Sequence, residues 1–421
     1  MTISSANGQP TRHPHIVLYS HDTMGIGHVR RNLLIAQQLA HAPLCAEVLL
    51  ISGAREAAAF EIPPRVDCLS LPSLYKDGHG SYRPRRLSIS LDELIQLRAT
   101  TIRSAIEAFQ PDVVIVDKVP HGVLGELDLT LENCQQKRPH WILGLRDILD
   151  DPKTVRQEWR EDDNERLIEE AYDAVWVYGD QSVYDPVREY GFSPGVAGKV
   201  RFLGYLDQRS RLDIQSPEEL DLLADLGLPS GKLLLCMVGG GQDGTEVADA
   251  FTRMELPPDY NGVLVTGPFM PTNVQQRLHQ RAALNDRMRV LDFIAEPDLL
   301  VAAADRIITM GGYNSVCSAI SFRKPALVVP RIYPRREQAI RAERLQELGL
   351  VDVLPWDEVS AARMSYWLAD DTATPCAYEA TNTIDLRGLE RLPILLQEVL
   401  EDTGHGLDRR HRRKEIRNVA R

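Results

Sequence analysis

The 421-residue sequence lacks the cysteine and aspartate spacings that mark metal sites. Its six cysteines are scattered without a C-x-x-C pair, and most lie in apolar runs, where a free thiol packs as a small hydrophobe. No two aspartates stand two positions apart, so an Asp-x-Asp metal clamp is missing. We therefore expect a reducing compartment, no zinc site, and no metal or other cofactor.

Long apolar runs and an excess of positive charge are also missing. No run approaches the ~18 apolar residues that a membrane-spanning helix needs, and residues 1–14 contain no apolar signal-peptide core. The formal net charge of -12 argues against a general nucleic-acid binder, which needs a basic face. These absences predict a soluble, cytoplasmic protein without a nucleic-acid partner.

Short apolar strands alternate with helical patterns along nearly the whole chain, which indicates parallel sheets. In the first half, the helices are expected at residues 29–41 and 90–109, and the strands at residues 15–20, 48–52, 113–117, 141–145 and 175–178. In the second half, the strands are expected at residues 233–238, 263–266, 290–291, 306–309 and 326–329. Residues 203–231 are rich in charge, proline and glycine and predict a linker.

The pattern predicts an α/β fold with two Rossmann-like domains whose parallel sheets face a central cleft. A chain of this length exceeds the size at which one core stops growing, so two domains are expected. We assign residues 1–205 to the first domain, 206–403 to the second and 404–421 to a tail. Ligands of open α/β sheets bind beyond the carboxyl ends of the strands, which places the active site in the cleft.

The tail carries seven basic residues against two acidic ones between residues 404 and 421. We expect a disordered, solubilising end. The alternative is a weak contact with an anionic membrane surface, at the inner face of the membrane.

The most informative segment is residues 307–330. It predicts a buried strand, a turn at Gly311 and Gly312, a short helix capped by Asn314 or Ser315, and a second strand. Such a turn aims backbone N–H groups and the positive end of the helix dipole at one point, which suits a phosphate.

A second glycine turn, with Gly25 and Gly27, lies between the first strand and its helix and is followed directly by His28. This position puts His28 at the ligand end of the sheet, and Asp117 ends a neighbouring strand. A carboxylate that holds one ring nitrogen of a histidine makes the other a better general base. The alternatives are that His28 is a surface residue and that Asp117 caps a turn.

Two further segments of the second half are candidates for ligand contact. Gly240, Gly241 and Gln242 follow a buried strand and allow a phosphate to approach closely, or they form a plain flexible connection. Glu337 and Gln338 begin a helix and can bind sugar hydroxyls, or they are ordinary first-turn residues. The nearby arginines, which pair with phosphate or solvate the loop, are Arg331, Arg335 and Arg336.

Taken in order, these segments resemble the GT-B glycosyltransferases, most of all the family 28 branch with the peptidoglycan N-acetylglucosaminyltransferase. The loop at Gly25–His28 is similar to the family's N-terminal glycine loop, and residues 239–244 to its second loop. Residues 145–152 and 334–338 have similar counterparts in a branch of predicted glycosyltransferases. Where the family usually has a glutamate that binds both ribose hydroxyls, this chain has Ser318. This departure puts nucleotide affinity and nucleotide choice in question.

The resemblance implies an N-terminal acceptor domain, a C-terminal donor domain, and inverting, metal-independent transfer of a hexosyl or N-acetylhexosaminyl group from a UDP-sugar to an acceptor hydroxyl. The acceptor is a glycan, a lipid-linked sugar or a small molecule. His28 and Asp117 are the implied catalytic residues. Phe293 and Ile294 match the positions that contact the uracil base of the nucleotide. The implied donor-binding residues are Gly25, Gly27, Gly240, Gly241, Gln242, Phe293, Ile294, Gly311, Gly312, Asn314, Ser315, Ser318, Glu337 and Gln338.

Two other functions fit the same architecture. One is a non-hydrolysing UDP-sugar 2-epimerase, which needs several acids and bases around the sugar ring. The other is a non-catalytic protein that binds a nucleotide sugar, a reading to which Ser318 lends weight.

Overall fold

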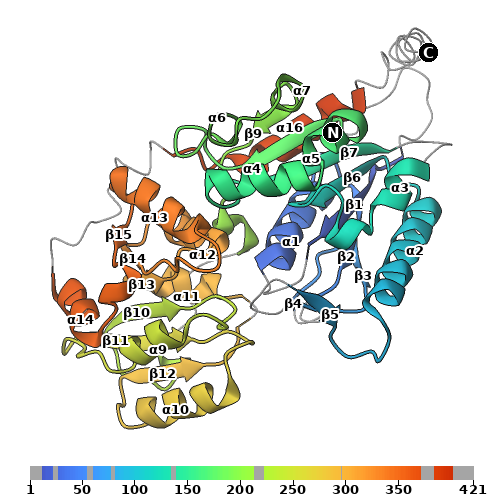
Figure 1. Ribbon diagram of the computed structural model, residues 1–421. Coiled ribbons are helices and arrows are strands. Elements are labelled where there is room, and N and C mark those ends of the chain that lie inside the picture. Colours follow the sequence, from blue (N-terminus) through green and yellow to red (C-terminus); the bar gives the residue numbers. More distant parts are fainter. Residues whose placement is uncertain are drawn as a thin grey trace, which may run out of the picture.

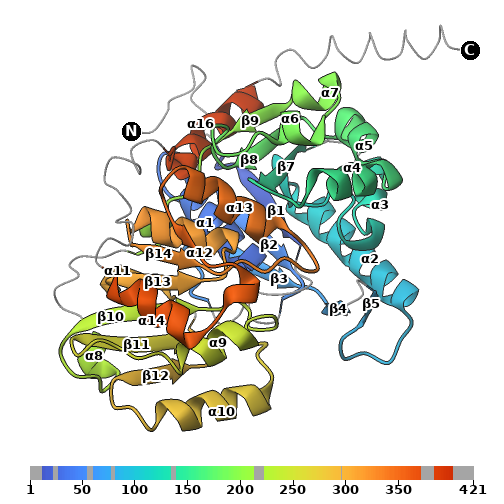
Figure 2. The ribbon, with the colours of Figure 1, turned by 60° about the vertical axis from the view of Figure 1, so that its left-hand side comes forward.

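The computed structural model describes residues 12–21, 27–54, 60–76, 81–133, 139–212, 222–294, 296–370 and 384–401. These residues form two α/β halves, each built on a parallel sheet (Figures 1 and 2). The expected α/β class and the two parallel sheets are confirmed. The basic tail after residue 404 and the turn residue Gly25 lie outside the described residues.

The N-terminal half holds a seven-stranded sheet in the order β3-β2-β1-β6-β7-β8-β9, and every neighbouring pair is parallel. The strands are β1 (His15–Ser20), β2 (Glu47–Ser52), β3 (Val66–Ser70), β6 (Val113–Asp117), β7 (His140–Arg146), β8 (Ala174–Tyr178) and β9 (Val200–Phe202). A small antiparallel pair joins β4 (Leu74–Lys76) to β5 (Tyr82–Pro84). Because β1, β6 and β7 are adjacent, the residues at their carboxyl ends meet at one edge of the sheet.

The helices of this half cover both faces of its sheet (Figure 1). They are α1 (Gly27–Ala40), α2 (Leu91–Phe109), α3 (Asp128–Asn133), α4 (Pro152–Glu161), α5 (Asn164–Ala171), α6 (Pro186–Tyr190) and α7 (Pro194–Ala197), with a 3₁₀ turn η2 at Val123–Gly125. Local sequence explains two of the starts. Ser90 and Glu93 form a capping box at α2, and Asp151 caps α4 ahead of Pro152.

The C-terminal half holds a six-stranded sheet in the order β12-β11-β10-β13-β14-β15. Its strands are β10 (Lys232–Met237), β11 (Tyr260–Val265), β12 (Met288–Leu291), β13 (Arg306–Thr309), β14 (Ala326–Val328) and β15 (Asp352–Val353). Its helices are α8 (Leu222–Asp225), α9 (Thr245–Phe251), α10 (Thr272–Ala282), α11 (Asp298–Ala303), α12 (Tyr313–Ser321), α13 (Glu337–Glu347) and α14 (Ala361–Ala369), with 3₁₀ turns η3 (Gln208–Arg211) and η5 (Trp356–Glu358).

The last described helix, α16 (Gly388–Glu401), leaves the C-terminal half and lies beside β9 of the N-terminal half (Figure 2). Arg387 bridges to Leu206, and the guanidinium of Arg391 donates to the carbonyl of Leu203. The helix falls inside the predicted second domain, residues 206–403, yet it packs against α1. The exact division of the chain at residue 205 stays a prediction.

One apolar cluster runs through both halves and includes Leu33 and Val29 of α1 together with Tyr313 and Val316 of α12. The buried members of the remaining apolar clusters each belong to one half, and Ile340 of α13 packs against the cluster of the N-terminal half. Burial of α1 against α12 therefore fixes the glycine turn before one helix close to the glycine turn before the other. No helix among the described residues is long and apolar enough to cross a membrane.

Candidate active site between the two halves

His28 lies at the start of α1 and Asp117 at the end of β6, so the neighbouring strands β1 and β6 bring them together. The Nδ1 atom of His28 is 2.6 Å from Oδ2 of Asp117. The other carboxylate oxygen accepts a hydrogen bond from Arg31, one helical turn after His28. The structure thus joins the two expected catalytic residues, while their roles stay predictions.

The charges around His28 define its protonation. Burial lowers the pKa of His28 to about 4, helped by Arg31 and Arg146 and opposed by Asp117. Burial alone would raise the pKa of Asp117, but the charge of Arg31 and the hydrogen bond with His28 bring it well below its usual value. At neutral pH the imidazole is uncharged next to an ionised carboxylate. The Nδ1–H then donates to Asp117, which leaves Nε2 as a proton acceptor.

The glycine turn of the C-terminal half touches this site directly. The side-chain amide of Asn314 donates to the backbone carbonyl of Gly27 at 2.8 Å. Ser315 donates to the carbonyl of Gly312 and accepts from Thr309. The predicted cap by Asn314 or Ser315 is wrong, because α12 has Gly312 at its N-cap and no side-chain cap there. Asn314 instead bonds across the interface, and Ser315 bonds back into its own turn.

The two glycines of this turn have different environments. Gly311 has a φ of 78°, a left-handed conformation that favours glycine, and a Cβ there would lie 2.8 Å from Cγ1 of Val328. A Cβ on Gly312 would lie 3.6 Å from Oγ of Ser315, an ordinary contact. Gly311 is therefore needed for the backbone path, and Gly312 is the one that leaves room for a ligand.

The second glycine loop packs partly against its own half. Gly241 has a φ of 90°, and a Cβ there would lie 2.1 Å from the carbonyl oxygen of Thr266. The carbonyl of Gly240 accepts from the amide of Phe269. Gln242 is exposed. The glycine at position 241 is thus explained by packing, whereas Gly240 and Gln242 stay candidates for ligand contact.

The residues expected near the uracil base and the ribose of the nucleotide are only partly accessible to solvent. Phe293 is half-buried and packs edge-on against Phe60 of the other half, with ring centroids 6.5 Å apart, and Ile294 is half-buried against the shared core. Ser318 is 1% exposed and donates to Oδ1 of Asp298. The second carboxylate oxygen of Asp298 pairs with Arg30 of α1. Ser318 thus lies within an ion-pair network that joins the halves.

Glu337 and Gln338 begin α13, and both bind Arg331. The guanidinium of Arg331 donates to Oε1 of Glu337 at 2.9 Å, and its backbone amide donates to Gln338 at 3.2 Å. Burial would raise the pKa of Glu337, but Arg331 and three other cations, Arg146 among them, lower it. A Cβ atom added to Gly311 would lie 3.8 Å from Cβ of Gln338, so α13 begins next to the glycine turn.

Sequence reasoning missed four charged residues of this interface. Arg341 of α13 forms a buried, doubly hydrogen-bonded ion pair with Asp147, which follows β7. Arg31 pairs with Asp117, as described above. Arg146, the last residue of β7, is half-buried, and its Nε has no hydrogen-bond partner among the described residues. The available signal was position, because Arg146 and Asp147 directly follow an apolar strand.

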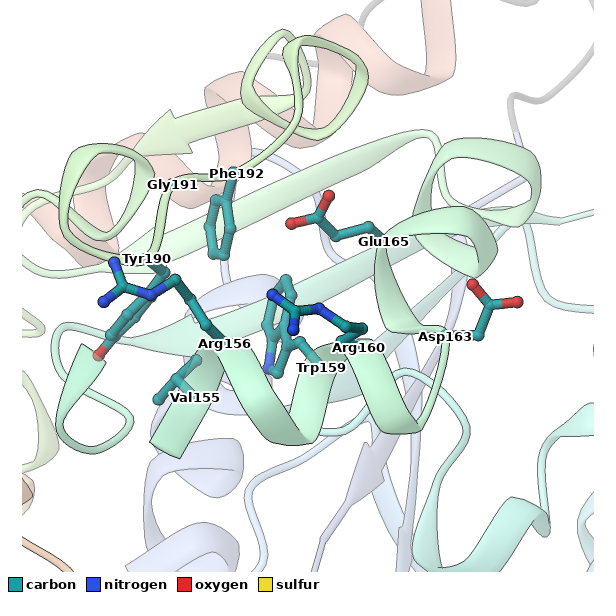
Figure 3. Close-up of a pocket in the computed structure, with 9 residues that line it drawn as sticks. All are labelled: Val155, Arg156, Trp159, Arg160, Asp163, Glu165, Tyr190, Gly191 and Phe192. Carbon is teal, nitrogen blue, oxygen red and sulfur yellow. The ribbon is translucent and has the colours of Figure 1, made fainter. Parts of the chain in front are cut away.

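Two of the cavities bear on the assignment of the site. One, of about 360 Å³, lies between α4, α5 and residues 190–192, where Trp159 and Phe192 stack with centroids 4.6 Å apart (Figure 3). It contains none of the expected site residues, so we do not assign it to the chemistry. A smaller one, of about 70 Å³, lies between the halves and is lined by Lys118, next to Asp117, and by Arg335.

Comparison with known proteins agrees with this geometry. Residues 236–388 match the glycosyltransferase family 28 C-terminal domain. The second half is therefore similar to this family's C-terminal domain. An uncharacterized glycosyltransferase of Methanosarcina acetivorans is 22% identical over 321 residues, covering 73% of this chain and 77% of that protein. Residues 236–388 contain the glycine turn, Ser318 and Glu337, so the segment that matches the family model supplies one wall of the interface described above.

Solved structures show the fold of the whole chain. The calicheamicin glycosyltransferase CalG4 matches with a TM-score of 0.58 and 16% identity, covering 93% of this chain and 99% of that one. The UDP-GlcNAc 2-epimerase of Neisseria meningitidis, bound to UDP-GlcNAc, matches with a TM-score of 0.58 and 15% identity, covering 92% and 100%. The chain thus has the GT-B fold, and the match to the family 28 C-terminal domain lies in its C-terminal half.

Proposed function

We propose that this protein is an inverting, metal-independent glycosyltransferase that moves a sugar from a UDP-sugar to an acceptor hydroxyl. The observation that carries the proposal is the contact of Asn314 with Gly27, because it brings the glycine turn of the family 28 domain next to the His28–Asp117 pair. The reaction needs a diphosphate bound at the glycine turn and a general base next to it, which is the role proposed for His28.

In this mechanism Nε2 of His28 takes the proton of the acceptor hydroxyl as the hydroxyl attacks the anomeric carbon. Asp117 orients the ring through Nδ1 and stabilises the imidazolium that forms. The bond from the anomeric carbon to the diphosphate breaks, and backbone N–H groups at Gly312 and the α12 dipole stabilise the leaving group. Closure of the halves around the donor excludes water and limits hydrolysis.

The transferred sugar in this proposal is a hexosyl or N-acetylhexosaminyl group, and the acceptor is a glycan, a lipid-linked sugar or a small molecule. We place the reaction in the cytoplasm. The residues that would hold the donor are those of the two glycine turns, Phe293, Ile294, Glu337 and Gln338.

A UDP-sugar 2-epimerase is the second candidate, since an epimerase bound to UDP-GlcNAc shares the fold. The acids of the interface favour the transferase. Asp117 and Glu337 both have a lowered pKa and each is paired with an arginine, so neither is suited to deliver a proton to a sugar carbon.

Incubation of the whole protein with radiolabelled UDP-sugars, with and without EDTA, tests the proposal. A transferase releases sugar slowly to water, passes it with inverted configuration to an added acceptor, and does both in EDTA. Interconverted UDP-sugars would identify an epimerase. Binding without any turnover would identify a nucleotide-sugar sensor. Activity that is lost in EDTA and restored by a divalent metal would contradict the metal-independent mechanism.

A further inference from the structure

Three arginines, Arg31, Arg146 and Arg341, lie near one another where the two halves meet. The guanidinium carbons of Arg31 and Arg341 lie 5.6 and 5.9 Å from the centroid of the Tyr313 ring, and Arg146 directly precedes the partner of Arg341, Asp147. Two of them have a buried carboxylate partner. Arg31 donates to Asp117, and Arg341 donates twice to Asp147. Arg146 makes no hydrogen bond or ion pair with any residue in the described part of the chain.

The nearest further carboxylate does not serve as the partner of Arg146. Glu337 acts on Arg146 electrostatically, but its Oε1 accepts from Arg331, and its Oε2 is buried without a hydrogen bond. Asp117 and Asp147 are each paired with one arginine of the cluster, and Glu337 shares Arg331 with Asp243. Of the three arginines, Arg146 is the one without an ion pair among the described residues.

A half-buried guanidinium without a counter-charge, whose Nε is buried without a partner, is costly to the ligand-free protein. A buried donor without a partner loses its hydrogen bonds to water and gains none in exchange. Burial and the neighbouring charges of Arg31 and Arg341 lower the pKa of Arg146, while Glu337 opposes this shift. Such an arrangement is expected where a ligand supplies the missing negative charge.

The position of Arg146 indicates where the negative charge of a ligand would lie. The residue ends β7, two strands from β1, and its charge reaches the ring of His28. Its neighbour Arg341 donates to the carbonyl of Gly311 in the glycine turn of the family 28 domain. An anion at Arg146 would therefore sit between the base and the glycine turn.

We propose that Arg146 binds an anionic group of the substrate, a phosphate or a carboxylate, held between the two halves beside His28. A guanidinium offers two parallel N–H donors, which fit the oxygens of either group. The inference rests on the proposed function for the identity of the substrate. Two sources have this chemistry: the diphosphate of the donor and an acidic group on the acceptor.

Calorimetric titration of the full-length protein and two variants tests the inference. Arg146→Met keeps most of the side-chain volume and removes the charge. Arg160→Met is the matched control, because Arg160 is an exposed arginine of the same half, on α4. The probes are UDP and uridine, and then orthophosphate and acetate added to protein with and without saturating UDP.

Each source gives its own result. If the donor diphosphate binds Arg146, Arg146→Met weakens UDP by about tenfold to a hundredfold and leaves uridine unchanged. If an acidic group of the acceptor binds there, UDP affinity stays the same, and orthophosphate or acetate binds the UDP-saturated wild type and the control but not Arg146→Met.

Equal binding of all four probes to the wild type and to Arg146→Met would overturn the inference, and so would a wild type that binds none of the anions. Failure of UDP alone to bind the wild type would refute the proposed function, while the orthophosphate and acetate titrations on the free protein would still decide about Arg146.

Thermal melts separate a binding role from a structural one. If Arg146 awaits a ligand, its replacement by Met leaves the melting temperature of the ligand-free protein unchanged or raises it, because a half-buried charge without a counter-charge has been removed. A lowered melting temperature together with unchanged anion binding would mean that Arg146 merely balances Glu337, and would overturn the inference.

Discussion

Arg341 and Asp147 hold the two halves together through a fully buried ion pair with two hydrogen bonds, of 2.8 and 2.6 Å. Arg341 also donates to the carbonyl of Gly311, and Asp147 accepts from the hydroxyl of Tyr205. One pair thus links the end of β7, the glycine turn and α13. The position of the glycine turn at Gly311 and Gly312 relative to His28 depends on this ion pair.

Breaking this pair should destabilise the protein strongly. Arg341→Met leaves Asp147 buried without its counter-charge, and removing one partner of such a pair costs about 3–5 kcal/mol. Denaturant unfolding measures the loss, with Arg344→Met as the control, at an arginine of the same helix whose side chain is 42% exposed. The double variant Arg341→Met/Asp147→Leu should recover part of the stability. A double variant less stable than the single one would contradict this account.

His28 should be essential to turnover and dispensable for donor binding. We expect His28→Ala to lower kcat by roughly 10²–10⁴-fold, the usual contribution of a general base, with UDP affinity nearly unchanged. Asp117→Asn should lower kcat by a smaller factor, since the imidazole of His28 remains. His41→Ala, at an exposed histidine just after α1, is the control. Wild-type turnover of His28→Ala on the true acceptor would show that another group is the base.

The lowered pKa of His28 also predicts how stability depends on pH. With a pKa of about 4 in the folded protein and an ordinary value near 6.5 when unfolded, the unfolded chain binds more protons between these values. The unfolding free energy therefore falls as pH drops through this window. Between pH 7 and pH 5 the unfolding free energy of the wild type should fall by about 2 kcal/mol more than that of His28→Gln. Parallel pH dependences of the two proteins would mean that His28 titrates normally.

The two glycines of the turn before α12, Gly311 and Gly312, should respond differently to substitution. From the sequence, a valine at either position is expected to block donor binding without unfolding the protein. The left-handed backbone of Gly311 changes that expectation for one of them, so Gly311→Val should lower the melting temperature. Gly312→Val should leave the melting temperature unchanged and lower the affinity for UDP. If both variants melt alike and bind UDP normally, no phosphate lies at this turn.

The sequence predicts the fold well and the interface poorly, for a physical reason. The strands ending at Ser20 and Asp117 follow from apolar runs of the right length, a property of local sequence. The pairing of Arg341 with Asp147 joins residues far apart in the chain, and no local pattern specifies it. His28 and Asp117 fall between these cases, because the parallel sheet brings strand ends together once its strand order is known.

Ser318 shows how tertiary context changes a prediction made from a motif. The resemblance to glycosyltransferases suggests that Ser318→Glu would restore ribose contacts and tighten UDP binding by about tenfold, roughly 1.4 kcal/mol. In the structure Ser318 is 1% exposed and bonded to Asp298, which pairs with Arg30 across the interface. A glutamate there would place a second carboxylate next to Asp298 with one arginine to share.

We therefore expect Ser318→Glu to lower the melting temperature and to weaken UDP, because burial of a second negative charge costs several kcal/mol and loosens the Arg30–Asp298 pair. Ser318→Ala is the matched variant: it removes one hydrogen bond, at a cost of about 1 kcal/mol, and adds no charge. Thermal melts and UDP titrations of both variants provide the test. Tighter UDP binding by Ser318→Glu at an unchanged melting temperature would show that the side chain at 318 reaches the ribose after all, and that α12 turns toward the nucleotide when the donor binds.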